Sequence, residues 1–309
     1  MIERDLQPLV SVVIPVYNGE KTLMGSLESV LNQKYTYMEI IIVDDGSDNP
    51  VELFLQPMIA DPRIRIIRTA RSNANIARNC GIKESKGDFI AMLDADDIWL
   101  ENHIIDCLGI MQKSNADGLY GSLFLHHQQS VDMTQLPIFY AREVREGESI
   151  IDYVLSAGKG AQTSTLFTTA HSMKDVLWNP ELIDHQDFDF IVRFSKKYKM
   201  TVKKEPTVVY NLTSGRAIHY ESCIRFVEDN IQDINPEVYM SYNLGMYVRA
   251  DQKAENKSFI LYFHKEAVRF KEYISYQHFI SICNPRSRVQ EWIHKLKYIF
   301  YILRIKTEI

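Results

Sequence analysis

The feature that most constrains the fold is a regular alternation of apolar and amphipathic segments up to about residue 115. Residues 9–18, LVSVVIPVYN, form a β-branched run that is typical of a strand buried on both faces of a parallel sheet. Residues 19–33 follow with apolar side chains at helical spacing. The pattern then repeats, with strands expected at 38–49, 63–70 and 88–93 and helices at 75–87, where Gly87 is the expected stop, and at 101–114. This order predicts an α/β fold with a mostly parallel sheet and right-handed crossovers.

The rest of the chain is patterned differently. Between residues 116 and 219 short strands and loops are mixed, with one clear amphipathic helix at 185–198. Residues 220–309 are rich in Tyr, Phe and Ile and are expected to be mainly helical. The sequence therefore predicts a first domain over 1–219, divided at about residue 115, and a helical region over 220–309.

Charge and cysteine content exclude several classes of protein. A net charge of −5 argues against a nucleic-acid partner. The four cysteines have no CxxC spacing, so neither a zinc site nor a disulfide framework is expected, and a reducing compartment is favoured. The N-terminal residues lack the basic and apolar regions of a signal peptide. No apolar run reaches the roughly 18 residues that would span a bilayer. We therefore expect a cytoplasmic protein.

Polar segments follow three of the expected strands. They read PVYNGE, VDDGSD and LDADD, and the last belongs to DFIAMLDADDIWL, which holds four carboxylates, Asp88, Asp94, Asp96 and Asp97. In an open α/β sheet, ligands bind at the carboxyl ends of strands. Asp, Asn, Gly and Ser are also ordinary turn residues, so each segment alone could be a turn. Adjacent carboxylates repel one another, and the cluster indicates either a cation site or a solvated turn in which Asp97 caps the next helix.

Four segments together resemble the family-2 glycosyltransferases. These are VSVVIPVYNGE, EIIIVDDGSDN, IARNCGIKESKGDFIAMLDADD and DHQDFDFIVRF, which cover about residues 10–215. The resemblance implies a GT-A fold (Rossmann-like, with a mostly parallel central sheet flanked by helices) and inverting transfer from a nucleotide-diphosphate sugar. It makes 1–219 the catalytic domain, with a nucleotide-sugar half and an acceptor half. It also implies a divalent metal, Mn²⁺ or Mg²⁺, at the diphosphate.

The resemblance assigns donor and metal roles to particular residues. Asp96 matches the metal ligand, and Asp94 matches a residue near the ribose, the sugar and the metal. Asp45 matches the acceptor of a hydrogen bond from uracil, whereas Asp44 is expected to bind nearby backbone. Arg78 is expected to pair with a phosphate or to hold Asp45, with a surface salt bridge as the alternative. The remaining candidates lie around the base in the first loop and are Pro15, Tyr17, Asn18 and Glu20.

The segment DHQDFDF carries the candidate general base. Inverting transfer needs a carboxylate that takes the proton of the acceptor hydroxyl, and the resemblance assigns this role to Asp187. The alternative is that Asp187 is simply an acid at a helix N-terminus. Many family members have Glu where this chain has Gln186. Further candidates are Arg193 in the same helix, and Arg216 and His219, which follow in a place where related enzymes close a loop over the diphosphate.

The last segment, residues 288–309, has one apolar stripe with Trp292 and Phe300 and six Lys, Arg or His positions. Such a helix can lie in a membrane interface, pack on the domain or form a dimer contact. Many relatives extend sugars on undecaprenyl diphosphate, which favours peripheral contact with the inner face of the membrane.

Taken together, the sequence predicts a metal-dependent hexosyltransferase that moves a sugar from a UDP-sugar to a glycan or an undecaprenyl-diphosphate-linked acceptor, in capsule or O-antigen synthesis. Two alternatives stay open. A nucleotidyltransferase would need a Gly-rich basic loop after the first strand, which PVYNGE does not provide. A non-catalytic nucleotide-binding subunit would have no need of Asp94, Asp96 and Asp187.

Overall fold

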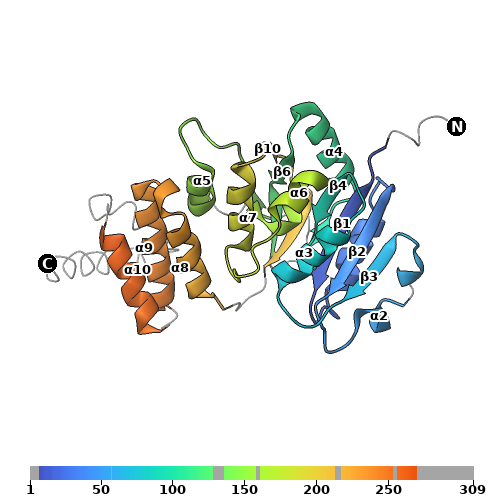
Figure 1. Ribbon diagram of the computed structural model, residues 1–309, viewed down its shortest axis with the longest axis horizontal. Coiled ribbons are helices and arrows are strands. Elements are labelled where there is room, and N and C mark those ends of the chain that lie inside the picture. The colour runs from blue at the N-terminus through green and yellow to red at the C-terminus, as the bar shows by residue number, and fades with distance from the viewer. Residues whose placement is uncertain are drawn as a thin grey trace. The chain divides into compact units, whose positions relative to one another are not determined.

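The computed structural model describes residues 7–56, 58–127, 136–157, 161–212, 217–252 and 256–269. The chain divides into two units, the first formed by residues 1–146 and 158–226 and the second by 147–157 and 227–309 (Figure 1). The predictions for Arg216 and for the segment 288–309 lie outside the described residues.

A seven-stranded sheet forms the centre of the first unit. Its strand order is β10-β6-β9-β4-β1-β2-β3. The neighbouring pairs are parallel except for the two that involve β9. The expectation of a mostly parallel sheet in an α/β fold is thus confirmed. The strands are β1 (Val10–Val16), β2 (Met38–Asp44), β3 (Ile64–Arg68), β4 (Phe89–Met92), β6 (Gly118–Gly121), β9 (Phe167–Thr169) and β10 (Met200–Lys203).

The central strand β1 is buried along its whole length. It contains Pro15, which is unusual in a central strand because proline donates no backbone hydrogen bond. The Val16 carbonyl faces β2, where it accepts from the Asp45 N–H, and the Val13 carbonyl faces β4. Backbone polar groups of successive strand residues point alternately toward the two neighbouring strands, so the backbone of Pro15, like that of Val13, points toward β4. Val13 is the last β1 residue that pairs with β4, and Pro15 lies two residues beyond it. Pro15 therefore interrupts no backbone hydrogen bond between β1 and β4 and lies where the pairing of these two strands has ended.

Helices cover both faces of this sheet. On one face, Val12 and Ile14 pack with apolar residues of α1 (Leu23–Leu31) and α4 (His103–Ser114). On the other, Ile41 and Val43 pack on Ala77 of α3 (Ala74–Glu84), and Figure 1 shows α3 in front of β1 and β2. The remaining helices are α2 (Val51–Phe54), α6 (Ala170–Val176) and α7 (Gln186–Ser195), with 3₁₀ turns at Met58–Ala60 and Thr163–Thr165.

Helix α3 ends earlier than expected. Its last residue is Glu84 rather than a residue next to Gly87, so Gly87 is not its stop. Instead Gly87 passes so close to β1 that a β-carbon there would lie 2.7 Å from the Leu9 carbonyl oxygen and from Ser11 atoms. This glycine is needed for close backbone approach.

A second, four-stranded sheet with the order β5-β11-β7-β8 completes the first unit. Its short strands are β5 (Ile98–Trp99), β7 (Leu123–His127), β8 (Ile138–Phe139) and β11 (Val208–Leu212). Strand β5 directly follows the LDADD segment, so this sheet carries the far end of that loop.

The second unit consists of helices in its described part. These are α5 (Ile150–Ala157), the end of α8 (Tyr220–Asp229), a 3₁₀ turn at Ile231–Asp233, α9 (Pro236–Gln252) and α10 (Lys257–Arg269). Between α9 and α10, the hydroxyl of the buried Tyr239 donates to the Glu266 carboxylate at 2.8 Å. The predicted helical character of this region is confirmed as far as Arg269. Among the described residues, no helix combines the length and apolarity needed to cross a bilayer.

Candidate active site

Three loops at the carboxyl ends of β1, β2 and β4 meet at one pocket of about 240 Å³ beside the start of α3. Seven of the residues predicted from the sequence line it, namely Pro15, Tyr17, Asn18, Asp45, Arg78, Asp94 and Asp96. Glu20 is exposed and is not part of the lining. Because loops far apart in the sequence meet at one sheet edge, the pocket has the position expected for a ligand site in an α/β sheet.

Asn18 joins the first two loops. Its backbone N–H donates to Ser47 Oγ at 2.9 Å, and its side-chain amide exchanges two 2.9 Å hydrogen bonds with Asp48. Asn18 has a left-handed φ of 50°, a conformation that asparagine tolerates better than most residues. Asp44 is fully buried and accepts from the Ser47 N–H and from Arg68, which fits the expected structural role. These contacts hold the loops that follow β1 and β2 together.

Asp45 is held by two residues that the sequence analysis did not single out. Its Oδ1 accepts from the Ser72 N–H at 2.9 Å and from Ser72 Oγ at 2.6 Å, and its Oδ2 pairs with Arg71. The Arg71 guanidinium also lies 3.5 Å from the centre of the Tyr17 ring. One cation thus orients both a carboxylate and an aromatic ring of the pocket. A basic residue shortly before α3 was the only signal in the sequence.

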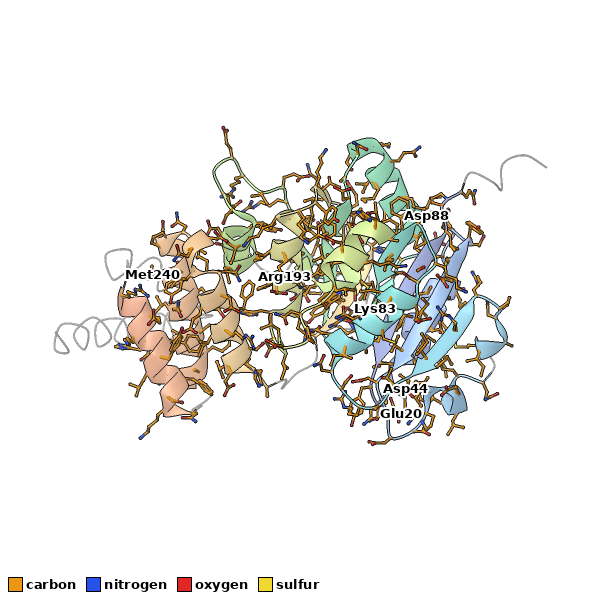
Figure 2. The ribbon with its side chains drawn as sticks, in the orientation of Figure 1. Glu20, Asp44, Lys83, Asp88, Arg193 and Met240 are labelled. Atoms are coloured by element: carbon orange, nitrogen blue, oxygen red, sulfur yellow. The ribbon has the colours of Figure 1, made fainter. Side chains whose placement is uncertain are left out.

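The four carboxylates of the LDADD region are separated by the fold. Figure 2 shows Asp88 at the opposite end of the sheet from Asp44, and Asp88 accepts from the Leu9 N–H at 2.8 Å. Asp97 is fully buried, and burial together with the neighbouring carboxylates raises its pKa well above the usual range. It does not cap a helix but accepts from Ser164 Oγ at 2.6 Å and from the Asn211 N–H at 3.0 Å. Of the four carboxylates, only Asp94 and Asp96 line the pocket.

Asp94 and Asp96 offer oxygen ligands of the kind that Mg²⁺ and Mn²⁺ prefer. Asp94 Oδ1 pairs with Arg78, and its backbone N–H donates to Ser164 Oγ. Within the described part of the chain, no group of three or more Asp, Glu, His or Cys side chains is arranged to hold a metal ion. The two carboxylates that line the pocket, Asp94 and Asp96, fit a cation that takes one or two carboxylates from the protein and its other ligands from a diphosphate and water.

Arg78 occupies the centre of the site and is 5% exposed. Its guanidinium donates to Asp94 at 2.8 Å, to Gln186 at 2.6 Å and to Asn75 at 2.9 Å. It also lies 4.6 Å from the centre of the Trp178 ring. The alternative that Arg78 holds Asp45 is wrong, because Arg71 does so, and Arg78 is not a surface salt bridge. It links the β4 loop to the start of α7.

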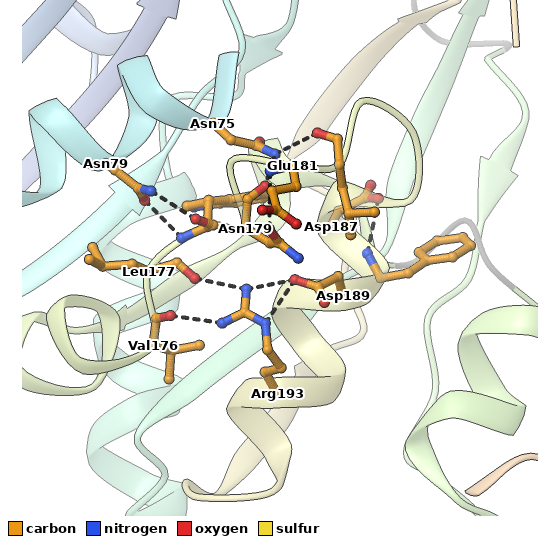
Figure 3. Close-up of polar contacts among 12 residues, drawn as sticks. Asn75, Asn79, Val176, Leu177, Asn179, Glu181, Asp187, Asp189 and Arg193 are labelled. Carbon is orange, nitrogen blue, oxygen red and sulfur yellow. Dashed lines mark hydrogen bonds and ion pairs between the residues drawn. The ribbon is translucent and has the colours of Figure 1, made fainter. Parts of the chain in front are cut away.

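A second pocket, of about 190 Å³, adjoins the first at Arg78 and Asp94. Apart from Arg78 and Asp94, its lining comes from three segments and includes Thr163, Asp184, His185, Asp187 and Tyr210. Asp187 lies in the first turn of α7, where its carboxylate accepts from the Phe188 N–H at 3.1 Å (Figure 3). Burial raises its pKa to about 6, against the opposing effect of Arg78. Such a carboxylate is poised to accept a proton near neutral pH.

The further candidates lie elsewhere. Arg193 binds Asp189 and the carbonyls of Val176 and Leu177, at 2.7 and 2.9 Å for the carbonyls, and lines neither pocket (Figure 3). His219 precedes α8, where its backbone N–H donates to Asp184 at 2.6 Å and its ring accepts from the Ser222 N–H. Asp184 lines the second pocket, so His219 contacts a residue of the pocket wall but does not line the pocket itself.

The sequence comparisons decide the family. The glycosyl transferase family 2 model matches residues 11–176, which include both strand-end carboxylate motifs. The chain belongs to glycosyl transferase family 2. It is a glycosyltransferase by that membership, and curated relatives carry the same description. The family that the sequence segments suggested is thus confirmed, while the segment DHQDFDFIVRF lies beyond the matched residues.

Two curated relatives match different shares of this chain. The amylovoran biosynthesis glycosyltransferase AmsB of Erwinia amylovora is 25% identical over 82% of this chain and 89% of its own. WfgD of Escherichia coli, a UDP-Glc:alpha-D-GlcNAc-diphosphoundecaprenol beta-1,3-glucosyltransferase, is 37% identical over 40% of this chain and 49% of its own. The shorter match therefore spans about half of that relative.

Solved structures support the GT-A architecture. S. aureus TarS in complex with UDP-GlcNAc superposes with a TM-score of 0.66 at 16% identity, covering 96% of this chain and 90% of that one. The mannosyltransferase PcManGT from Pyrobaculum calidifontis, in complex with GDP-Man and Mn²⁺, gives a TM-score of 0.54 at 12% identity, covering 98% and 83%. At these identities the likeness concerns the fold alone.

Proposed function

We propose that this glycosyltransferase is an inverting, metal-dependent enzyme that transfers a sugar from a UDP-sugar to a hydroxyl of a glycan. The observation that carries the proposal is the pair of adjoining pockets that share Arg78 and Asp94. One has paired carboxylates suited to a diphosphate-bound cation, and the other has a carboxylate with a raised pKa. A donor in the first pocket would present its anomeric carbon toward the second.

The residues of the first pocket would bind the nucleotide. Tyr17 offers a ring face to the base, and Asp45 offers carboxylate oxygens to an imide N–H, with Arg71 and Ser72 fixing its orientation. Asp94 and Asp96 would hold Mn²⁺ or Mg²⁺ against the diphosphate. When bound, this ion supplies Lewis-acid stabilisation of the negative charge on the departing nucleotide.

Asp187 would act as the general base. As the acceptor oxygen bonds to the anomeric carbon, its proton passes to the Asp187 carboxylate and the bond from the anomeric carbon to the diphosphate oxygen breaks, with the electron pair leaving on UDP. Arg78 would hold Asp94 and the start of α7 in a fixed relation during this step. One displacement on the opposite face inverts the configuration of that carbon.

The acceptor proposed here is a sugar of a surface polysaccharide or of an undecaprenyl-diphosphate-linked oligosaccharide. Support comes from AmsB, which is named for amylovoran biosynthesis, and from WfgD, whose named acceptor is diphosphoundecaprenol-linked GlcNAc. A place in the cytoplasm with peripheral contact at the inner face of the membrane would bring the enzyme to such an acceptor. The 1–219 region would carry catalysis, and the helical region would serve membrane or oligomer contact.

The test is a screen of UDP- and GDP-sugars with Mn²⁺ or Mg²⁺ for release of nucleotide diphosphate, with and without short glycan acceptors. The expected result is release from one UDP-sugar that depends on metal and increases with acceptor. Metal-dependent UDP binding without turnover of any donor would favour a non-catalytic subunit. Release of pyrophosphate from a nucleoside triphosphate would instead favour a nucleotidyltransferase.

A further inference from the structure

Asparagines at the N-cap of α3 and within this helix hold the segment that leads into α7. Asn73 donates to the Pro180 carbonyl at 2.9 Å. Asn79 exchanges two hydrogen bonds with the backbone of Trp178, at 2.8 and 2.7 Å. Figure 3 shows the hydrogen bonds of Asn79 together with those of Arg193, which binds the carbonyls of Val176 and Leu177. The sequence NANIARN thus places side chains along one strip of the helix that faces a single loop.

Asn75 differs from the other two in what its side chain joins. Its amide nitrogen donates to the carbonyls of Asn179 at 2.6 Å and Leu182 at 2.9 Å, and its amide oxygen accepts from Arg78 at 2.9 Å. Asn75 is fully buried, so these three bonds are made away from solvent. Asn75 thus ties the loop and the central arginine to one side chain, as Gln186 also does from the loop side, where its amide binds Arg78 and a loop carbonyl.

The loop is held in a conformation that it would not adopt readily by itself. Leu177 has a φ of 48° and His185 a φ of 61°, both in the left-handed region that disfavours residues with a β-carbon. Such residues persist only where surrounding contacts fix them. The two carbonyls that Asn75 binds lie between Leu177 and His185 in the sequence. Helix α7 begins directly after His185, with Gln186 and Asp187 in its first turn.

We infer that Asn75 is a positioning residue, which sets the direction of the Arg78 guanidinium and the location of the α7 N-terminus together. Through Arg78 it acts on Asp94 and Gln186, and through Leu182 it acts on the turn that presents Asp187. The inference rests on the proposed function of Asp94 and Asp187. It predicts that loss of Asn75 misplaces the base relative to the donor without emptying the donor pocket.

The experiment compares Asn75→Ala with Asn79→Ala in the full chain. Asn79→Ala is the matched control, because it removes two hydrogen bonds between the same helix and the same loop but none to Arg78. For Asn75→Ala we expect UDP affinity within about 2-fold of wild type and kcat lower by about 10- to 100-fold, the scale on which small misplacements reduce turnover. For Asn79→Ala we expect kcat within about 3-fold of wild type.

Hydrogen–deuterium exchange gives a second measurement that needs no substrate. Exchange over residues 183–190 should rise in Asn75→Ala and stay near wild type in Asn79→Ala. If the wild type turns over no UDP-sugar, the proposed function fails, while this exchange difference still tests the anchoring. Equal losses of kcat in both variants, or unchanged exchange at 183–190 in Asn75→Ala, would overturn the inference. Should Asn75→Ala not fold, Asn75→Ser replaces it, since water can occupy the space beside the shorter hydroxyl.

Discussion

Replacing Asp187 by Asn should make the protein more stable and less active. Burial raises the Asp187 pKa from 3.8 to about 6 in the folded protein. A raised carboxyl pKa means that the folded state binds the proton more tightly than the unfolded chain. The ionised form is therefore disfavoured in the folded state, and stability falls as pH rises from the unfolded pKa through the folded one.

The size of the effect follows from the gap of about 2 pKa units. At 1.36 kcal/mol per unit, ionised Asp187 lowers the free energy of unfolding by about 3 kcal/mol at about pH 8. Asparagine is uncharged at every pH, so the variant should gain about 3 kcal/mol at pH 8, about half of that at pH 5, and nothing below about pH 3. Turnover should fall by roughly 100-fold or more because an amide cannot accept the proton.

Urea unfolding of wild type and variant at several pH values measures the stability difference. The matched control is Asp189→Asn in the same helix turn, where the carboxylate pairs with Arg193 at 2.6 Å. That change should lower stability by about 1–2 kcal/mol, opposite in sign. The wild-type kcat should decline as pH falls through about 6. A stability difference for Asp187→Asn that does not change with pH would refute the reasoning.

Three further outcomes follow from the site and the sequence. Asp96→Ala should abolish metal-dependent UDP binding in calorimetry while its circular dichroism matches wild type; near-normal turnover would remove Asp96 from the metal site. Arg71→Ala should weaken UDP affinity by about 10-fold, because Asp45 and Tyr17 lose their shared cation; unchanged affinity contradicts that. Deleting 288–309 should release the protein from anionic liposomes and spare activity on a short soluble acceptor, with wild-type binding weakening in salt. Insolubility of the truncated protein would instead indicate that this segment packs in the fold.

The first half of the fold could be predicted because its strands are rich in β-branched apolar residues and its longer helices have an apolar face. The predicted strand at 9–18 contains β1, and the predicted helix at 101–114 contains α4. The second sheet could not be predicted, because strands such as β5 and β8 have two residues each and leave no periodic signal. Strand β5 forms only by pairing with β11, which follows about a hundred residues later in the chain.

The site was predictable where a side chain follows a strand end, as for Asp45, Asp94 and Asp96. The site was less predictable where the hydrogen-bond partner of a side chain comes from a distant part of the sequence. The pairing of Arg78 with Gln186 crosses 108 residues, and that of Asn75 with Leu182 crosses 107. Nothing local in NANIARN distinguishes a solvent-facing asparagine from a buried one. Asp97 likewise could be read as a cap, because its buried partners Ser164 and Asn211 are remote.

The anchoring of Asp97 has a consequence for synthesis of the protein on the ribosome. The loop that bears Asp94 and Asp96 is fastened by Ser164 and by the backbone of Asn211. When residue 97 emerges, its carboxylate oxygens must wait 67 further residues for Ser164 and 114 for Asn211. A nascent chain can thus complete β1 to β4 early, yet the loop proposed to hold a metal gains its contacts with Asn211 only when β11 has emerged. Stalled or truncated chains ending before that strand would carry the family's sequence motifs without a working site.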